Sequence, residues 1–535
     1  MSGKIIKSGA KVKELVQKGV NTLANTVGVT LGPRGRNVAM RQSWGTPHIT
    51  KDGITVARNI SFKDQFEDMG AQLVRAAAQK TVDEAGDGTT TATILAQAIY
   101  NKGLYLLAAG YNPMDLKKGI DKAIKIIVDY LNKMTKPIQN QEEIEQIGSI
   151  SANDPEIGAL IAEAVSKVGK EGVITIDESP TFETHLDISE GMHFDRGYIT
   201  PWFITNVEKS QADLNNCFVL IHEDRLEDVK SLVPLFEEVA KQGRPLLIIA
   251  EDFGQNFLAT LIFNKRNGSF FSCPVKSPGF GERRKEILRD LAVLTGATLF
   301  AKELGNDVAK CEIEDLGQAT KIVVNRTGTT IIGGAGKKED IIARINQIRD
   351  DIKHVDNDYD KKRMQERLAK LAGGVAIIRV GAPTEPEMKE KKDRVEDAMH
   401  ATRAAVEEGI VPGGGVALLR CIPILKEFSD SLLNHGEKAG VEVIMTALQA
   451  PIRLIVQNAG GMPDVVVAAI MSEDNVDFGY NAATDIYENL VESGVIDPKK
   501  VVRSAIQNAA SVASMLLTTE AMIADDPSDV EKTKE

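Results

Sequence analysis

Hydrophobic residues recur at every third or fourth position near the start of the chain, a spacing typical of amphipathic helices. The first series predicts a helix that stops at the turn sequence "TLGPRGR", and it consists of Val12, Leu15, Val16, Val20, Leu23 and Val27. A second helix is expected over about 64–84, and a third directly after the threonines at 89–91. A fourth is expected from Pro113, which follows a natural N-cap at Asn112, and should end before Pro137.

The pattern changes between about residues 190 and 375, where short β-rich runs such as "CFVLIH" alternate with helical segments. This alternation predicts parallel strands joined by crossover helices. Charged residues with isoleucine or leucine at helix spacing over 338–372 predict an antiparallel pair of helices. One strand follows Gly373 and Gly374, and then a long helix from about 385 to 408 ends at Gly409. The chain is expected to be helical again from there on.

Composition narrows the class of protein. The chain has 535 residues, of which 43% are hydrophobic, and its 76 acidic against 64 basic residues give a net charge of −12. This charge argues against nucleic-acid binding. The first residues contain no run that suits a signal peptide, and the apolar run "DVVVAAIM" is too short to cross a membrane, so a cytoplasmic protein without a membrane contact is expected. The four cysteines and seven histidines show no spacing of a disulfide framework or zinc site.

The stretch "DEAGDGTTTATILAQAIY" places Asp87 between two glycines and ahead of three threonines, at the start of a predicted helix. Free N–H groups and hydroxyls at a helix start can bind an anion, and a carboxylate beside phosphate oxygens can hold Mg²⁺. The ordinary alternative is an N-cap with β-branched filler, and the stretch alone leaves both interpretations open.

No Walker A sequence occurs, because "GGAGKKED" lacks the first glycine and the Ser or Thr after the lysine. Several other polar segments could form one pocket: "TLGPRGR" at 30–36, "TKDG" at 50–53, "GDGTTTAT" at 86–93, "VEDAMHATRAAVEEG" at 395–409, "VPGGG" at 411–415, "YNAAT" at 480–484 and "VIDPKKVVRSA" at 495–505. In this combination and order, from about residue 10 to 523, the chain resembles the group I chaperonins, the GroEL-type sixty-kilodalton family. The stretches "EGMHFDRGY" and "SPGFGERRK" belong to the same resemblance.

The resemblance implies an α+β multidomain fold that assembles into rings. A mostly helical equatorial domain would comprise 1–133 and 409–535, a small α/β intermediate domain 134–189 and 376–408, and an α/β apical domain 190–375. The hinges would lie at Pro137, Gly191, Gly373, Gly374 and Gly409. For Gly409, a hinge and a simple helix cap are equally compatible with the sequence.

The resemblance also implies a site for ATP, Mg²⁺ and K⁺. Asp397 would be the general base for hydrolysis, assisted by Asp52, and Asp87 would bind Mg²⁺. Thr30 and Lys51 would lie near K⁺. The nucleotide itself would contact Thr30, Leu31, Gly32, Pro33, Lys51, Gly88, Thr89, Thr90, Thr91, Gly414, Asn481, Ala482, Ala483 and Asp497.

Non-native polypeptides and a GroES-type cochaperonin would bind an exposed apolar surface of the apical domain. The matching positions are Tyr198, Trp202, Phe203, Val233, Phe236, Leu258, Ile262 and Phe263. Taken singly, each of these residues could equally pack in a core. Asn256 and Asn267 replace charged residues that are common in the family, and the chain has no C-terminal Gly-Gly-Met repeat.

Further contacts between segments and subunits follow from the resemblance. Arg196 and Glu385 match a pair that latches apical to intermediate segments, although Pro386 lies beside the second. Seven-membered rings, stacked as two, are implied. At the ring-stacking positions Tyr105 and Met462 replace a lysine and an acid, so Arg453 is expected to lack its partner.

Three functions are compatible with these observations. The first is an ATP-hydrolysing folding chaperonin, and the second is a divergent paralogue that binds unfolded chains with little ATP turnover. The third, a metabolic phosphotransferase with a Gly-Asp-Gly-Thr loop, leaves the other pocket segments unexplained. The presence of Asp52, Asp87 and Asp397 favours the first.

Overall fold

The computed structural model describes residues 3–41, 47–138, 140–152, 154–169, 172–179, 181–207, 209–227, 229–355 and 357–525. The chain divides into two compact units, Met1–Ala162 with Pro383–Glu535, and Glu163–Ala382. The predicted apical range 190–375 lies wholly inside the second unit. The predicted intermediate segments are shared between the two units, and the three-domain division stays a prediction. The C-terminal tail beyond residue 525 lies outside the described residues.

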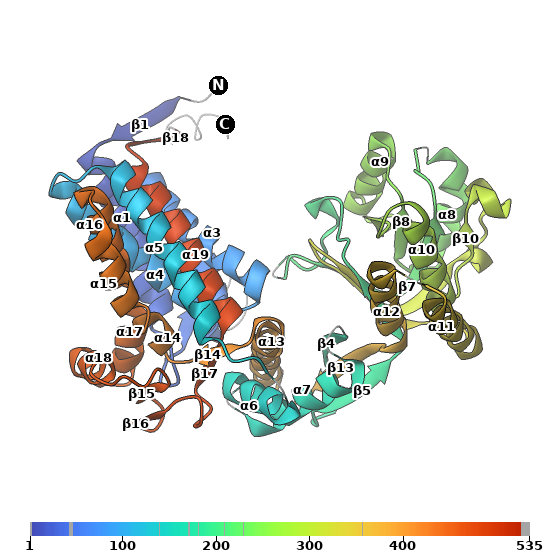
Figure 1. The fold of residues 1–535 in the computed structure, drawn as a ribbon. Coiled ribbons are helices and arrows are strands. Elements are labelled where there is room, and N and C mark those ends of the chain that lie inside the picture. The colour runs from blue at the N-terminus through green and yellow to red at the C-terminus, as the bar shows by residue number, and fades with distance from the viewer. Residues whose placement is uncertain are drawn as a thin grey trace. The chain divides into compact units, whose positions relative to one another are not determined.

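The first unit is built mainly of helices, as the sequence pattern predicts (Figure 1). Its bounds before the second unit are β1 (Lys4–Ser8), α1 (Ala10–Gly28), β2 (Val38–Met40), β3 (His48–Thr50), α2 (Gly53–Asn59), α3 (Gln65–Ala85), α4 (Thr89–Ala108), α5 (Pro113–Met134), α6 (Gln141–Ala152) and the start of α7 (Pro155–Val168). After it come α13 (Glu385–Glu408), β14 (Ile410–Pro412), α14 (Val416–Leu419), α15 (Ile422–Ser431), α16 (His435–Ala447), α17 (Ala450–Asn458), α18 (Pro463–Met471), β15 (Phe478–Asn481), β16 (Ile486–Asn489), β17 (Ile496–Pro498), α19 (Lys499–Thr518) and β18 (Ala521–Asp525).

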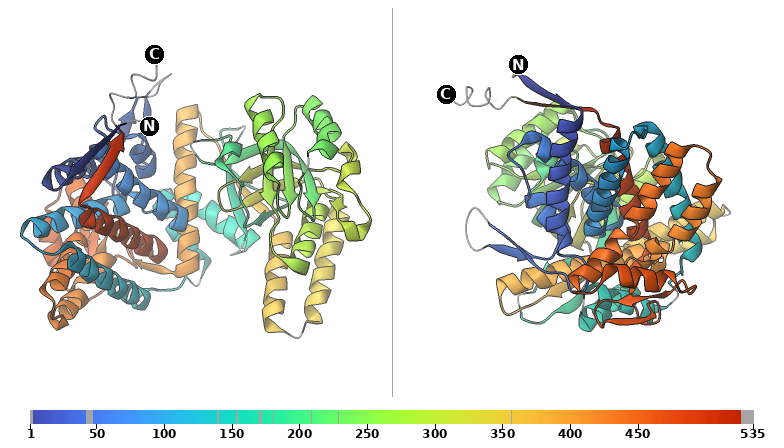
Figure 2. Two further views of the ribbon diagram at one scale, coloured as in Figure 1. Left: turned by 90° about the horizontal axis from the view of Figure 1, so that it is seen from above. Right: turned by 90° about the vertical axis from the view of Figure 1, so that its left-hand side faces the viewer.

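Helix α19 is the centre of the first unit, where it packs against α3, α4 and α5 (Figure 1). The predicted apolar series of α1 packs in the same core, with Leu23 and Val27 fully enclosed and Leu15 half-buried. The two ends of the described chain lie side by side, because β1 pairs antiparallel with β18 (Figure 2, right). The core therefore joins helices that are hundreds of residues apart in the sequence.

The helix ends follow the predicted caps, with one correction. The Asn112 side chain accepts hydrogen bonds from the Met114 and Asp115 N–H groups, and Pro113 opens α5. By contrast, α4 begins at Thr89, so the threonines form its first turn and do not precede it. Gly88, with φ of 88°, ends the preceding loop in a conformation that favours glycine, and this allows the helix to start at once.

Gly409 ends α13 with φ of 82°, and a side chain there would come within 2.7 Å of the Lys136 carbonyl oxygen. Both facts explain this glycine as a helix cap. Its role as a hinge stays a prediction.

One apolar segment is longer than the sequence analysis expected. His435–Asn458, which covers α16 and α17, is long and apolar enough to cross a membrane by length and composition. More than half of it is buried inside the unit, where α16 packs against α4 and α5. This burial is what a core helix shows.

The second unit contains a seven-stranded sheet in the order β6-β12-β11-β7-β8-β9, with β10 also beside β7. Its strands and helices are β4 (Val173–Glu178), β5 (His185–Ser189), β6 (Gly191–Phe194), β7 (Ala212–His222), α8 (Val233–Lys241), β8 (Leu246–Ala250), α9 (Gln255–Arg266), β9 (Ser272–Lys276), α10 (Gly281–Thr295), β10 (Leu299–Phe300), β11 (Gly317–Val324), β12 (Thr329–Gly334), α11 (Lys338–Lys353), α12 (Asp358–Ala372) and β13 (Val375–Val380). Short helical turns are η1 (Pro201–Phe203), η2 (Lys230–Leu232), η3 (Lys302–Leu304), η4 (Val308–Lys310) and η5 (Ile313–Asp315).

Strands β7 to β10 are parallel and alternate with helices, as predicted, whereas β6, β11 and β12 pair antiparallel. The antiparallel pairing of β11 with β12 follows from the turn between them. There the Asn325 side chain accepts hydrogen bonds from the Thr327 and Gly328 N–H groups, and the chain reverses. The predicted helix pair α11 and α12 forms a hairpin (Figure 2, left). A separate three-stranded sheet has the order β4-β13-β5.

Candidate active site

The loop between α3 and α4 holds Asp87 at the start of a buried helix. Gly86 and Gly88 on either side both have positive φ, at 78° and 88°. The Asp87 carboxylate accepts a hydrogen bond from the Gly88 N–H, and α4 follows with the buried Thr89. A helix start exposes N–H groups without helical partners, so this loop presents donors, hydroxyls and a carboxylate together.

A second segment, at the start of α2, packs directly on the threonines. The Asp52 carboxylate caps α2 by accepting hydrogen bonds from the Ile54 and Thr55 N–H groups, each at 3.1 Å. A side chain on Gly53 would lie 2.2 Å from the Thr90 hydroxyl oxygen. The glycine is therefore required for α2 to approach α4, and Asp52 reaches the site because of it. Lys51, just before Asp52, is exposed.

A third segment, after α1, connects the two sides of the site. The Thr30 hydroxyl oxygen lies 3.5 Å from that of Thr90, and the Asn458 side-chain amide donates to the Leu31 carbonyl at 2.9 Å. Gly32 has φ of 86°. One step further, the Arg34 guanidinium donates to the Ala483 carbonyl at 3.2 Å. The loop with Leu31, Gly32 and Pro33 is thus tied to the loop of Asn481, Ala482 and Ala483, which is also predicted to contact the nucleotide.

The fourth side of the site is formed by β14, β17 and the loop after β15. Pairing of β14 with β17 places Asp497 opposite Val411. Gly414 has φ of 64°, and the nearest atom to a side chain placed there would be the Tyr480 carbonyl oxygen at 4.0 Å, which leaves space above it. The Asn481 side-chain oxygen accepts a hydrogen bond from the Ala483 N–H at 3.0 Å and fixes the loop that includes Ala482.

Four carboxylates from four segments meet at this site: Asp52, Asp87, Asp397 and Asp497. Burial, followed by the charges of Asp87 and Asp52, raises the pKa of Asp397 well above its ordinary value. Burial and then the charge of Asp87 raise the pKa of Asp497 to about 7. Burial also raises the pKa of Asp87, and Asp52 adds to this effect. The Asp397 residue is nevertheless exposed at the surface. Many protein atoms lie near its carboxylate, and this is the burial that raises its pKa.

Helix α13, which carries Asp397, packs against α6, α19, β17 and α3 of the same unit. His400 packs on Gly86, where a side chain would come within 2.6 Å of the His400 Cβ. At the end of α13, Glu408 pairs with Arg503 at 2.6 Å and with Lys499 at 3.1 Å, and Glu407 pairs with Lys500.

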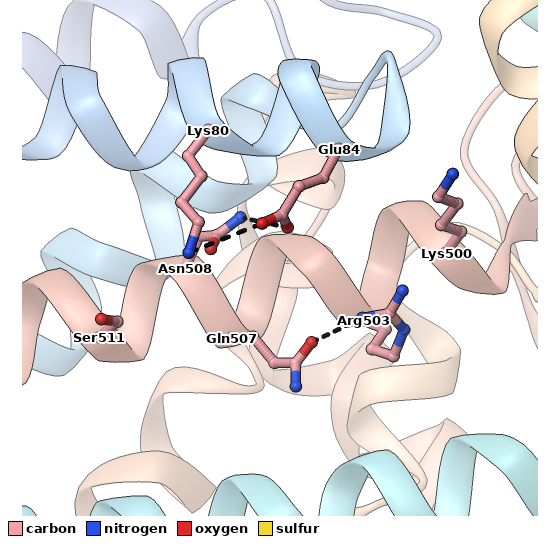
Figure 3. Close-up of a pocket in the computed structure, with 7 residues that line it drawn as sticks. All are labelled: Lys80, Glu84, Lys500, Arg503, Gln507, Asn508 and Ser511. Atoms are coloured by element: carbon pink, nitrogen blue, oxygen red, sulfur yellow. Dashed lines mark hydrogen bonds and ion pairs between the residues drawn. The ribbon is translucent and has the colours of Figure 1, made fainter. Parts of the chain in front are cut away.

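Next to this anchor lies an open groove of about 400 Å³ between α3 and α19 (Figure 3). It is lined by Lys80, Glu84, Lys500, Arg503, Gln507, Asn508 and Ser511. The Asn508 amide donates to the Glu84 carboxylate and to the Thr81 hydroxyl, each at 3.2 Å. These bonds connect α3 to α19. The lining residues Lys500 and Arg503 pair with Glu407 and Glu408, so the same part of α19 also holds α13.

The residues present suit a magnesium nucleotide. Within the described ranges, no three His, Cys, Asp or Glu side chains form a group that could hold a metal ion. Mg²⁺ needs only one or two carboxylates when phosphates supply the remaining ligands, so Asp87 is sufficient for the predicted role. The charges of Asp52 and Asp87 act on Asp397, and that of Asp87 acts on Asp497, but within the described ranges none of the four carboxylates forms an ion pair.

All predicted nucleotide residues belong to the first unit, and the structure brings their segments together. The sequence analysis did not assign a role to Gly53, Arg34, Asn458 or His400. The first two lie inside the quoted segments "TKDG" and "TLGPRGR" and could have been found there. His400 also lies inside a quoted segment, "VEDAMHATRAAVEEG". Asn458 lies outside the quoted segments, and no local pattern marks it.

The eight predicted polypeptide-binding residues divide into three groups in the second unit. Trp202 and Phe263 are 63% and 64% exposed, and Val233 is 39% exposed. Tyr198, Leu258 and Ile262 are half-buried at the edge of the core.

The expectation of exposure is wrong for the remaining two, Phe203 and Phe236, which are core residues. The Phe236 ring stacks on Phe270 at 5.2 Å and meets the edge of Phe257, because α8 covers the sheet with this face.

Two predicted charge contacts also change. Arg453 lacks the acid that Met462 replaces, as expected, but it has another acidic partner, because its guanidinium lies 2.7 Å from the Asp464 carboxylate. Glu385 pairs with Lys389 at 2.8 Å, and the Arg196 guanidinium lies over the Phe280 ring at 5.6 Å. Since Arg196 and Glu385 belong to different units, their latch stays a prediction.

Comparison with known proteins shows the family of this chain. The family model for the TCP-1/cpn60 chaperonin family matches residues 23–527. The chain belongs to this family. The resemblance found in the sequence is thereby confirmed.

A solved structure similar to this chaperonin is the crystal structure of the chaperonin gp146 from the bacteriophage EL 2 (Pseudomonas aeruginosa) in the presence of ATP-BeFx. It has a TM-score of 0.69 and 22% identity, and the match covers 98% of this chain and 99% of that chain. At this identity the likeness establishes the fold, and this fold agrees with the predicted mixed α and β architecture.

Proposed function

We propose that this chaperonin hydrolyses ATP and uses the hydrolysis to fold non-native polypeptides inside a ring closed by a GroES-type cochaperonin. The observation that carries the proposal is the meeting of Asp52, Asp87, Asp397 and Asp497 beside a threonine-rich helix start. Such a set of uncompensated carboxylates next to free N–H groups suits a phosphate chain bound together with a metal ion.

Asp87 would hold Mg²⁺, and Thr30 and Lys51 would lie beside K⁺. When bound, the magnesium ion neutralises charge on the phosphates. The N–H groups and hydroxyls of Thr89, Thr90 and Thr91 orient the phosphates at the start of α4. The predicted base-contacting residues Asn481, Ala482 and Ala483, with Gly414 opposite, would hold the nucleoside. That the similar phage chaperonin was crystallised with ATP-BeFx supports nucleotide binding here.

Asp397 would take a proton from the attacking water. A general base works best when its pKa lies near the working pH, and burial together with Asp87 and Asp52 raises the pKa of Asp397 in that direction. Asp52, held at the start of α2, keeps this charge arrangement in place.

Client binding would use the exposed Trp202, Phe263 and Val233 with the half-buried Tyr198, Leu258 and Ile262. Exposed apolar surface of this kind marks an interaction site. The family implies rings of subunits, and we propose seven per ring and two rings.

Steady-state ATP turnover of the purified protein, with and without Mg²⁺ and a GroES-type cochaperonin, tests the proposal. We expect magnesium-dependent turnover that changes when the cochaperonin is added. Binding of unfolded protein without ATP turnover would instead identify a passive polypeptide-binding paralogue. Negative-stain images of the same sample would give the number of subunits and rings.

A further inference from the structure

Lys265 lies in the last turn of α9 and reaches the short helix η1. Its ammonium donates hydrogen bonds to the backbone oxygens of Trp202, at 2.8 Å, and of Ile204, at 2.6 Å. The same nitrogen lies 5.1 Å from the centre of the Phe271 ring. Two carbonyls and one aromatic face can together occupy all three N–H groups of the ammonium.

This choice of partners is unusual for a lysine. In the described part of the second unit, no carboxylate acts on Lys265, and burial lowers its pKa. A partly buried ammonium without an acidic partner is costly unless its hydrogen bonds are satisfied. Trp202 and Ile204 lie at the end of η1, where carbonyl groups lack helical partners and a cation is favourable. Lys265 therefore caps η1 from a different helix.

The two elements that Lys265 joins carry the two most exposed aromatic rings of the predicted client surface, Trp202 on η1 and Phe263 on α9. On its other side, η1 is anchored by Phe203, which is fully buried. Phe203 fixes η1 to the core but does not connect it to α9 by a polar contact, whereas Lys265 does.

We propose that Lys265 is a positioning residue for client binding, which holds Trp202 and Phe263 at the separation where both can contact one apolar segment of a polypeptide. This inference rests on the proposed function. Without the ammonium, the carbonyls of η1 lose their donor, and Trp202 can move away from α9. The folded core stays intact, because Phe203 remains buried.

The test uses the full-length protein and a reduced, alkylated model protein that cannot refold. Lys265→Met, which keeps length and apolar volume, should weaken capture about 10-fold, the scale of losing charge-assisted hydrogen bonds. Lys265→Arg should restore most of the affinity. Arg266→Met removes a charge from the next, exposed position of α9 and should change capture less than about twofold. Equal losses in Lys265→Met and Arg266→Met would overturn the proposal, since net charge would then explain both.

Trp202 gives a second readout that does not depend on capture. The chain has two tryptophans, so a Trp44→Phe background makes Trp202 the sole tryptophan, which excitation above the tyrosine absorption reports selectively. Acrylamide should quench Trp202 more strongly in Lys265→Met than in the parent, and unchanged quenching would contradict the proposal.

In the parent, quenching should also rise as alkaline pH removes the Lys265 proton, and this transition should be absent in Lys265→Arg. The titratable group acting on Lys265 from the sheet is Cys273, whose pKa burial raises to about 12, so its thiol stays neutral over this range.

Failure of the proposed function gives a different result. If Trp202→Ser and Phe263→Ser capture the model protein as well as the parent, this surface does not bind clients. The quenching and pH measurements would then still report whether Lys265 positions η1.

Discussion

Each of the two units contains a cluster of crowded acids, and the clusters differ in how their charge is balanced. In the second unit, the fully buried Asp290 lies 2.7 Å from the Arg344 guanidinium and 2.5 Å from that of Arg367. Glu286 pairs with the same two arginines. Burial raises the pKa of Asp290, but both guanidinium groups oppose this effect. Arg289 also pairs with Glu286, so two negative charges meet three positive ones.

In the first unit, burial and neighbouring negative charge raise the pKa of Asp87, Asp397 and Asp497. Within the described residues, neither these three acids nor Asp52 forms an ion pair with Lys, Arg or His. A buried acid is stabilised by a cation or becomes protonated. The balanced cluster needs nothing from outside and fixes α11 and α12 to α10. For the unbalanced cluster we propose that a cation from solution stabilises the acids, and the difference would then distinguish a ligand site from a structural ion pair.

The largest effect is expected from Asp87→Ala, which should abolish measurable Mg·ATP binding because the metal loses its protein ligand. Isothermal titration with and without Mg²⁺ measures this. The control is Asp83→Ala, an exposed acid one turn earlier on α3, which should leave the affinity unchanged. If the Asp87→Ala protein binds Mg·ATP with the parent's affinity, Asp87 is not the metal ligand. The proposed difference between the two clusters would then be wrong.

The next effect concerns the balanced cluster. Arg344→Met leaves Asp290 buried with one cation fewer, and we expect a destabilisation of about 3–5 kcal/mol in the second unit. Hydrogen exchange of α10, α11 and α12 locates the loss, since the two units need not unfold together. Arg349→Met, at an exposed position on the same helix, should leave exchange unchanged. Equal protection in both variants would mean that the paired charges are not needed for the hairpin.

Asp397→Ala should have a smaller effect, a fall of about 10²-fold in ATP turnover with nearly intact nucleotide affinity, as expected when a general base is lost. Single-turnover hydrolysis and nucleotide titration separate the two quantities. Asp393→Asn, one turn earlier on α13, removes a charge that also acts on Asp397 and should slow turnover only slightly. A parallel collapse of affinity and rate in Asp397→Ala would make Asp397 a structural residue.

Local patterns in the sequence predicted the elements well where helix physics decides the outcome. The apolar series of α1, the cap at Asn112 and the end of α13 at Gly409 all depend on residues within a few positions of one another. The start of α4 was placed too late, because threonine is a weak helix former whereas the fold uses it in the first turn.

The site could not be predicted by local reasoning. Asp52, Asp87 and Asp397 are far apart in the sequence, and only the resemblance to chaperonins connected them. The burial of Phe236 could not be predicted either. The sequence pattern of an apolar helix face is the same whether the face covers a sheet or is exposed to solvent. The ion pair between Arg453 and Asp464 was missed because Asp464 lies two positions after the replaced residue, Met462.

The smallest effect is expected at the proposed ring-stacking face, where charge is neither buried nor crowded. Tyr105 and Met462 are 69% and 74% exposed, and the ion pair between Arg453 and Asp464 is partly exposed. An exposed pair contributes about 0–1 kcal/mol, but a ring repeats each contact, so small differences add up. We expect double rings that release single rings on dilution or with nucleotide, and mass photometry over a dilution series at two salt concentrations measures this. Met462→Glu should favour double rings only slightly, because Asp464 already occupies Arg453. Adding Asp464→Asn frees Arg453 and should enlarge the shift at low salt. Double rings that persist unchanged at every dilution would rule out the weak interface.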